Sequence, residues 1–159
     1  MQARLQTPGA RVLAQRDIDA EFTSVFIANG ASGLRSFTSA DQLVELKGRR
    51  LAFGSESSTS GRLMPQFFMG ENGVKPEDLA GGGPGFSGSH DATIAVVQSG
   101  AYEAGALNEQ VWRSNMANGR VDPSKVSVIW RTPPYVEYHW VVRPGLDERF
   151  GDGFTDKLQ

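Results

Sequence analysis

A buried strand, a polar turn and a helix are predicted, in that order, by the residues Arg50-Leu-Ala-Phe-Gly-Ser-Glu-Ser-Ser-Thr-Ser-Gly-Arg-Leu-Met-Pro-Gln-Phe-Phe-Met-Gly70. The first five are apolar enough for a short buried strand, and residues 55–60 form a polar loop. Apolar side chains then recur at helical spacing from Leu63 to Phe68. Pro65 falls in the first turn of this helix, where proline is tolerated. A strand followed directly by a helix is typical of an α/β fold.

The same alternation continues along the rest of the chain. Ser39 and Gln42 have the spacing of a capping box at the start of one further helix. Short strands that are almost continuously apolar are typical of parallel sheets. We therefore expect an α/β fold with a mostly parallel sheet flanked by helices. The strands are predicted at 23–28, 50–54, 85–88, 102–107, 126–130 and 138–142, and the helices at 37–46, 61–70, 91–98, 108–117 and after residue 144.

Length and composition exclude several classes of protein. A chain of 159 residues, 39% hydrophobic and 21% charged, has the composition of a globular protein. Its 16 basic and 18 acidic residues are scattered without a basic stripe, so we expect no nucleic-acid partner. It has no apolar run long enough for a direct membrane span. With no cysteine and only two histidines, the chain offers little for a metal site, and we expect no cofactor.

Hydroxyl groups are concentrated in the loop that leads into the helix at 61–70. In a parallel sheet, ligands bind beyond the carboxyl ends of the strands, which is where this loop lies. The side chains of Ser58, Thr59 and Ser60, with the free N–H groups of the helix N-terminus, would form a cradle for an anion. Helix capping accounts for one such hydroxyl, but four stand in a row here. We therefore predict that an oxyanion binds to this loop.

Two other loops end at the same predicted sheet edge. His90 would lie at a helix N-terminus and could donate a hydrogen bond to an anion, although a structural histidine is the alternative. Ser89 is the predicted N-cap of that helix. Asn108 is either an N-cap or a ligand contact, and spacing alone does not separate the two.

A small serine hydrolase using Ser60 or Ser87 is an alternative function. The segment Gly85-Phe-Ser-Gly-Ser matches the nucleophile-elbow pattern only in part, because its last position is not glycine. No pair of acid and base residues stands out beside either serine. We therefore expect no catalytic residue.

Several long segments resemble the phosphonate-binding (PhnD-like) periplasmic proteins of ABC importers. They are Leu46-Lys-Gly-Arg-Arg-Leu-Ala-Phe-Gly-Ser-Glu-Ser-Ser-Thr-Ser-Gly-Arg-Leu-Met-Pro65, Phe86-Ser-Gly-Ser-His-Asp-Ala92, Gly105-Ala-Leu-Asn108 and Val128-Ile-Trp-Arg-Thr-Pro-Pro134. The sequences of residues 16–22 and 106–112 most resemble those of selenate-uptake binding proteins of that family. The resemblance extends over nearly the whole chain.

This resemblance implies a type II periplasmic binding fold, in which two α/β lobes joined by two crossing strands hold an anion in a cleft. It implies that Ser58, Thr59 and Ser60 contact the oxyanion and that His90 is a further contact. Tyr138 stands where phosphonate and phosphite binders typically carry an aspartate. An aspartate can accept a proton from such a ligand, whereas a tyrosine offers a donor, which suits a fully ionised oxyanion such as selenate or sulfate.

The resemblance also implies a division of the chain. Residues 1–22 would be a remnant of the first lobe with the first crossing, 23–132 the second lobe, and 133–159 the second crossing with a truncated return. The N-terminus has no signal-peptide pattern, and we expect the chain to be part of a longer protein. That protein would act in the periplasm, binding a small oxyanion for an ABC permease. The alternative is a sensor input lobe of a signalling protein.

Overall fold

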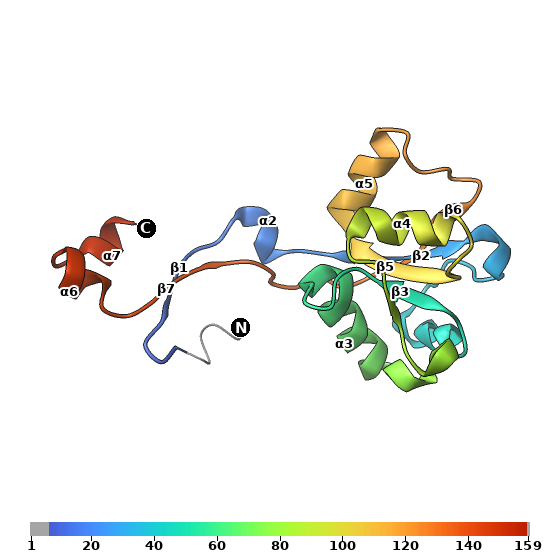
Figure 1. Ribbon diagram of the computed structural model, residues 1–159, viewed down its shortest axis with the longest axis horizontal. Helices are drawn as coiled ribbons and strands as arrows, with labels where there is room; N and C mark the ends of the chain where they lie inside the picture. Colours follow the sequence, from blue (N-terminus) through green and yellow to red (C-terminus); the bar gives the residue numbers. More distant parts are fainter. Residues whose placement is uncertain (1–6, 159) are drawn as a thin grey trace. The chain divides into compact units, whose positions relative to one another are not determined.

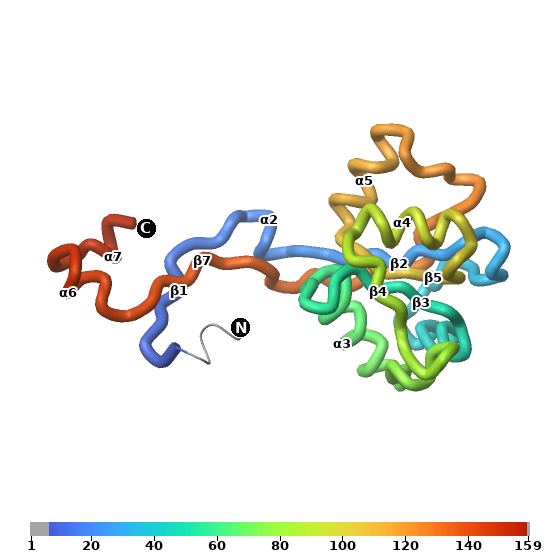
Figure 2. The backbone as a smooth tube through the Cα atoms, in the orientation of Figure 1, coloured from blue at the N-terminus to red at the C-terminus, as the bar shows by residue number. Residues whose placement is uncertain are grey.

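The computed structural model describes residues 7–158. The chain forms two compact units: unit 1 comprises Met1–Phe22 with Pro134–Gln159, and unit 2 comprises Thr23–Pro133. The chain therefore runs from unit 1 into unit 2 once and returns once, as can be followed in Figure 2.

Unit 2 is built on a five-stranded sheet with the order β4-β3-β5-β2-β6. Strand β3 pairs in parallel with β4 and β5, whereas β2 pairs antiparallel with both β5 and β6. The α/β fold is confirmed, but the sheet is mixed rather than mostly parallel. An apolar run shows that a strand is buried but does not show its direction. In the antiparallel pair, β2 starts where β5 ends, with Ser24 opposite Asn108. The strands are β2 (Ser24–Asn29), β3 (Leu51–Phe53), β4 (Gly85–Phe86), β5 (Ala104–Asn108) and β6 (Val126–Arg131).

Helices cover both faces of this sheet (Figure 1). On one face, α4 (His90–Gln98) and α5 (Glu109–Ala117) pack on the strands, and on the other lie the 3₁₀ helix η2 (Ala40–Leu46) and α3 (Met64–Glu71). Strand β2 serves both layers because its side chains alternate: Val25 and Ile27 pack with α4 and α5, and Phe26 packs with η2 and α3. Each such fully buried side chain stabilises the fold by roughly 1.5–3 kcal/mol.

Two helices of unit 2 depart from the predicted pattern. The capping box at η2 is absent, because Ser39 makes no side-chain cap and Gln42 Oε1 instead accepts the backbone N–H of Thr38 at 2.7 Å. The helix predicted at 61–70 begins earlier, with a π-helical turn η3 (Thr59–Leu63) that continues into α3. Three short 3₁₀ turns complete the unit: η1 (Gly30–Ser32), η4 (Pro76–Asp78) and η5 (Ala80–Gly82).

Unit 1 contains a two-stranded antiparallel ribbon and short helices. Strand β1 (Arg11–Ala14), which the sequence analysis missed, pairs with β7 (Trp140–Val142). The single helix predicted after residue 144 is two helices, because Gly151 and Gly153 between them adopt φ values of +101° and +73°. The helices are α2 (Asp17–Ala20), α6 (Leu146–Phe150) and α7 (Phe154–Lys157). In the described range 7–158, no helix has both the length and the apolarity needed to cross a bilayer.

Candidate functional site

The hydroxyl-rich turn after β3 closes between two glycines. The Gly54 N–H donates to the Gly61 carbonyl at 2.9 Å, and the Gly61 N–H donates to Ser58 Oγ at 2.9 Å. A Cβ atom on Gly61 would lie only 2.8 Å from Cε1 of His90 and 2.9 Å from Ser58 Oγ. Glycine at 61 therefore lets the turn approach the first residue of α4, which brings two of the predicted loops together.

The three predicted hydroxyl residues have different environments. Ser58 Oγ caps the π-helical turn, and Ser60 is almost fully buried, with its carbonyl accepting the Ser24 hydroxyl at 2.7 Å. Within residues 7–158, the Thr59 and Ser60 hydroxyls have no hydrogen-bond partner, and Thr59 is the more exposed of the two residues. A π-helical turn bonds each N–H to the carbonyl five residues back, so its first amides lack partners inside the turn. The turn thus presents neutral donors at a partly positive helix end.

His90 and Asn108 meet at the same edge of the sheet. The backbone N–H of Asn108 donates to Nδ1 of His90 at 3.4 Å, which leaves Nε2 as the ring nitrogen that carries hydrogen. Burial lowers the pKa of His90, and the nearby Asp91 carboxylate opposes this only in part. The ring is therefore neutral at pH 7 and can donate one hydrogen bond without bringing a charge.

Asn108, whose role the sequence left open, and Ser89, which was predicted as a cap, both cap helices in the structure. Asn108 Oδ1 accepts the N–H groups of Gln110 and Val111 at 2.7 and 3.2 Å, so it is the N-cap of α5, and its amide nitrogen remains a possible donor. Ser89 caps α4 as predicted, accepting the Ala92 N–H at 3.1 Å.

Ser87 is engaged by the protein itself. Its hydroxyl lies 3.0 Å from the Phe53 carbonyl, 2.9 Å from the Ser89 carbonyl and 2.8 Å from Thr93 Oγ1. These contacts hold the loop after β4 in place. Across residues 7–158, no group of three or more His, Asp or Glu side chains is gathered in a way that could hold a metal ion.

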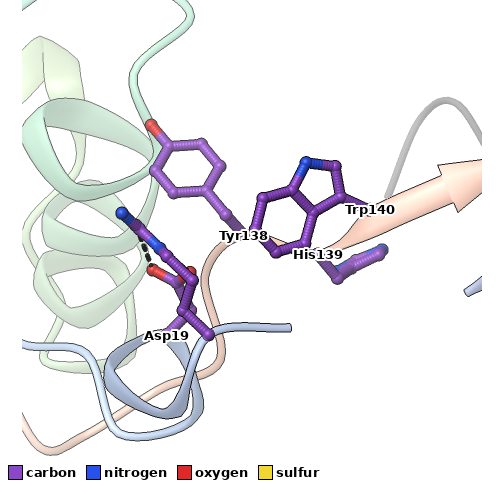
Figure 3. A pocket seen from close by; sticks show the side chains of 5 residues that line it. Asp19, Tyr138, His139 and Trp140 are labelled. Atoms are coloured by element: carbon purple, nitrogen blue, oxygen red, sulfur yellow. Dashed lines mark hydrogen bonds and ion pairs between the residues drawn. The ribbon is translucent and has the colours of Figure 1, made fainter. Parts of the chain in front are cut away.

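Tyr138 belongs to unit 1. It lines a pocket of about 280 Å³ with Arg16, Asp19, His139 and Trp140 (Figure 3). The Arg16 guanidinium holds the buried Asp19 carboxylate through two bonds of 2.6 and 2.7 Å. Burial, together with the charges of Glu137 and Asp19, raises the pKa of Tyr138, so the phenol keeps its proton at neutral pH.

Some residues that shape these sites were missed from the sequence. Gly61 was placed at the start of a helix, although its position after four hydroxyl residues is a signal for close backbone approach. Ser24, Glu109 and the pair Arg16–Asp19 carry no local signal, because their partners are distant in sequence or lie in segments not predicted to be ordered.

A family model described as "ABC transporter, phosphonate, periplasmic substrate-binding protein" matches residues 1–158. The chain belongs to this phosphonate-binding family. Members of the family are periplasmic solute-binding proteins and not enzymes, so the serine-hydrolase alternative is not favoured.

Curated relatives in the phosphonate-binding family are longer than this chain. It is 54% identical over 159 residues to "Probable ABC transporter phosphite binding protein PhnD1" of Prochlorococcus marinus, a match covering 100% of this chain and 54% of the relative. It is 28% identical over 116 residues to the "Phosphate-import protein PhnD" of Mycolicibacterium smegmatis, covering 65% of this chain and 36% of that protein. The chain thus spans about half the length of the curated relatives it matches, or less.

Solved structures agree with the fold. PhnD1 from Prochlorococcus marinus in complex with methylphosphonate superposes with a TM-score of 0.87 at 54% identity, covering 99% of this chain and 58% of PhnD1. A binding-protein component of an ABC phosphonate transporter from Pseudomonas aeruginosa superposes with a TM-score of 0.62 at 24% identity, covering 94% of this chain and 47% of that one. The second likeness supports the fold alone.

Proposed function

We propose that this chain is part of the substrate-binding component of an ABC importer and that it binds a small phosphorus oxyanion. The family match and the relatives named for phosphite and methylphosphonate support this class of ligand. The relatives described above are named for phosphorus compounds, which favours these over the selenate that the sequence resemblance suggested. No observation favours the sensor alternative.

The observation that carries the proposal is the approach of His90 to the turn at Gly61. A Cβ atom on Gly61 would lie 2.8 Å from His90 Cε1, so the neutral imidazole lies against the turn that carries the hydroxyls of Thr59 and Ser60 and the first amides of η3. All these groups are donors and all are uncharged. Such a cradle would bind a tetrahedral oxyanion by several charge-assisted hydrogen bonds, each worth roughly 1.5–3 kcal/mol.

We assign Ser58, Thr59, Ser60 and His90 as ligand contacts on unit 2. Asn108 contributes its amide nitrogen, because its oxygen is committed to capping α5. Tyr138 is a further proposed ligand contact, because its phenol stays protonated and can donate a hydrogen bond.

The two units fit the division that the family resemblance implies. We interpret unit 2, Thr23–Pro133, as the second lobe of a two-lobed binding protein, and unit 1 as both crossings with parts of the first lobe. The protein that contains this chain would deliver its ligand to an ABC permease from the periplasm, as the family description implies.

A chimera tests the proposal in a protein of full length. Residues 1–159 replace the matching segment of PhnD1, and calorimetry measures binding of methylphosphonate, phosphite and selenate. We expect Thr59→Ala and Ser60→Ala each to weaken methylphosphonate binding about tenfold or more, because each removes a hydrogen bond to a charged group.

Ser57→Ala is the matched control. Ser57 is an exposed residue of the same turn, outside the proposed contacts, and its loss should leave the affinity unchanged. Equal affinities for Thr59→Ala, Ser60→Ala and Ser57→Ala would contradict the cradle. Tighter binding of selenate than of either phosphorus ligand would contradict the ligand class.

A further inference from the structure

Both connections between the units are anchored on one buried carboxylate, that of Glu109. The chain enters unit 2 at Thr23 and leaves it at Pro133, two residues after Arg131 (Figure 2). Glu109, the first residue of α5, is only 4% exposed. Its Oε2 accepts the Thr23 hydroxyl at 2.5 Å and Arg131 Nε at 2.8 Å. One carboxylate oxygen thus binds the residue that precedes the incoming strand β2 and the last residue of the outgoing strand β6.

The second oxygen of this carboxylate completes the anchor. Glu109 Oε1 pairs with Nη2 of Arg131 at 2.8 Å and with Nη2 of Arg113, one turn along α5, at 2.6 Å. Burial raises the pKa of Glu109, but the hydrogen bonds from Arg131, Thr23 and Arg113 outweigh it and lower the pKa to about 2. The carboxylate is therefore charged throughout the physiological range, and two cations and a hydroxyl surround it.

The anchored strands lead on to the turn that holds the proposed anion cradle. Ser24 and Thr132 are bonded twice, with the Ser24 N–H donating to Thr132 Oγ1 and the Thr132 N–H donating to the Ser24 carbonyl, both at 3.0 Å. The Ser24 hydroxyl then donates to the Ser60 carbonyl at 2.7 Å. On the other side, Asn108 precedes Glu109 and donates its N–H to His90.

We propose that Glu109 is a positioning residue that fixes both interunit connections to α5, an arrangement we call the clasp. Through Ser24 and Asn108, the clasp keeps the Ser60 turn and His90 in position. The part of this inference that concerns the ligand rests on the proposed function. The clasp itself does not, because its contacts involve only residues of unit 2.

Hydrogen exchange of single amides, followed by NMR on the 159-residue chain, tests the clasp without any ligand. We expect Glu109→Gln to speed exchange of the Ser24 and Thr132 amides about tenfold or more, because charge-assisted hydrogen bonds are lost at both connections. The Ala104 amide, at the far end of β5, should keep its rate. Glu103→Gln is the matched control, because Glu103 is a half-buried glutamate that, like Glu109, pairs with two arginines, here Arg49 and Arg50. It should leave Ser24 and Thr132 unchanged.

Thr23→Val keeps the inference testable where Glu109→Gln does not fold. It removes a single hydroxyl from the clasp and leaves both arginines on the carboxylate. We expect a smaller acceleration, confined to the same two amides. Uniform acceleration of all amides would show a merely structural role for Glu109 and overturn the inference, as would unchanged rates at Ser24 and Thr132.

Binding to the chimera tests the link from the clasp to the cradle. Glu109→Gln should weaken methylphosphonate binding about tenfold, whereas Glu103→Gln should not. An unaltered affinity, together with faster exchange at Ser24 and Thr132, would overturn the link and retain the clasp. A chimera that binds no oxyanion even without substitution would contradict the proposed function, and the exchange data would still decide the clasp.

Discussion

Among the described residues, unit 2 buries most of its large apolar side chains, whereas unit 1 buries few of its own. In unit 2, Phe26, Phe53 and Leu107 are fully buried between the sheet and its helices. In unit 1, Trp140 and Phe150 are 57% and 53% exposed, and the sheet is a two-stranded ribbon. Such a ribbon is marginally stable unless other elements cover it. Unit 2 thus has its own core and carries the cradle, whereas unit 1 needs further contacts to bury its apolar surface.

The largest expected effect concerns affinity. We expect the 159-residue chain to bind methylphosphonate only at millimolar strength, and the chimera to bind roughly a thousandfold tighter or more. An oxyanion held by one lobe stays hydrated, whereas closure of two lobes removes water and strengthens each hydrogen bond. Calorimetric titration of both proteins measures the ratio.

The same comparison predicts association of the isolated chain. The exposed apolar surface of unit 1 should favour dimers or larger species, which light scattering would detect. A strictly monomeric chain that binds methylphosphonate at micromolar strength would show that unit 1 needs no further partner.

The next effect concerns stability and compares one aromatic residue from each unit. Phe53→Ala should lower the free energy of unfolding by about 3–5 kcal/mol, because it opens a cavity in a closed core. Trp140→Ala should change it by less than about 1 kcal/mol, because that side chain is already largely in solvent. Urea denaturation followed by circular dichroism gives both values. Equal losses in the free energy of unfolding would mean that Trp140 contributes as much to stability as a fully buried core residue of unit 2.

A smaller effect is expected at the glycine that faces His90. Gly61→Ala should displace the imidazole and weaken methylphosphonate binding by the chimera about tenfold, because overpacking costs roughly 1–3 kcal/mol. Gly70→Ala is the control, since nothing lies within 4 Å of a Cβ there. If the two variants bind alike, the approach of His90 to the turn does not matter for the ligand.

The smallest effect is the pH dependence of stability that His90 contributes. Its pKa is lowered in the folded chain by burial, so the unfolded chain binds the proton more readily. The contribution of His90 to the free energy of unfolding is complete above its unfolded pKa of about 6.5 and is lost as the pH falls below that value. Thermal unfolding between pH 7.5 and 5.5 should show this loss, and His90→Gln should reduce it. A dependence of the same size in His90→Gln would assign it to other groups.

The sequence was most informative where the signals were local. The apolar runs of β2, β3 and β5, the cap Ser89 and the hydroxyl row before α3 are encoded in adjacent residues and were found, and the cap role of Asn108 was one of two alternatives left open. The direction of β2 was not, because a strand buried on both faces looks the same in either orientation.

Contacts between distant segments account for the rest. Glu109 joins Thr23 and Arg131 across the sheet, and no spacing rule connects these three positions. Strand β1 was missed because it is only four residues long and its pairing partner, β7, is distant in the sequence. The ligand assignments of Ser58, Thr59, Ser60, His90, Asn108 and Tyr138 stay predictions until binding is measured.

The most direct test of the cradle is an NMR titration of the isotope-labelled 159-residue chain with methylphosphonate, which detects even millimolar binding. We predict saturable shifts of the Thr59, Ser60 and Gly61 amides and of the His90 ring nitrogens, with the β1–β7 ribbon of unit 1 unchanged. Shifts confined to the ribbon, or no saturable shift at the turn, would contradict the account.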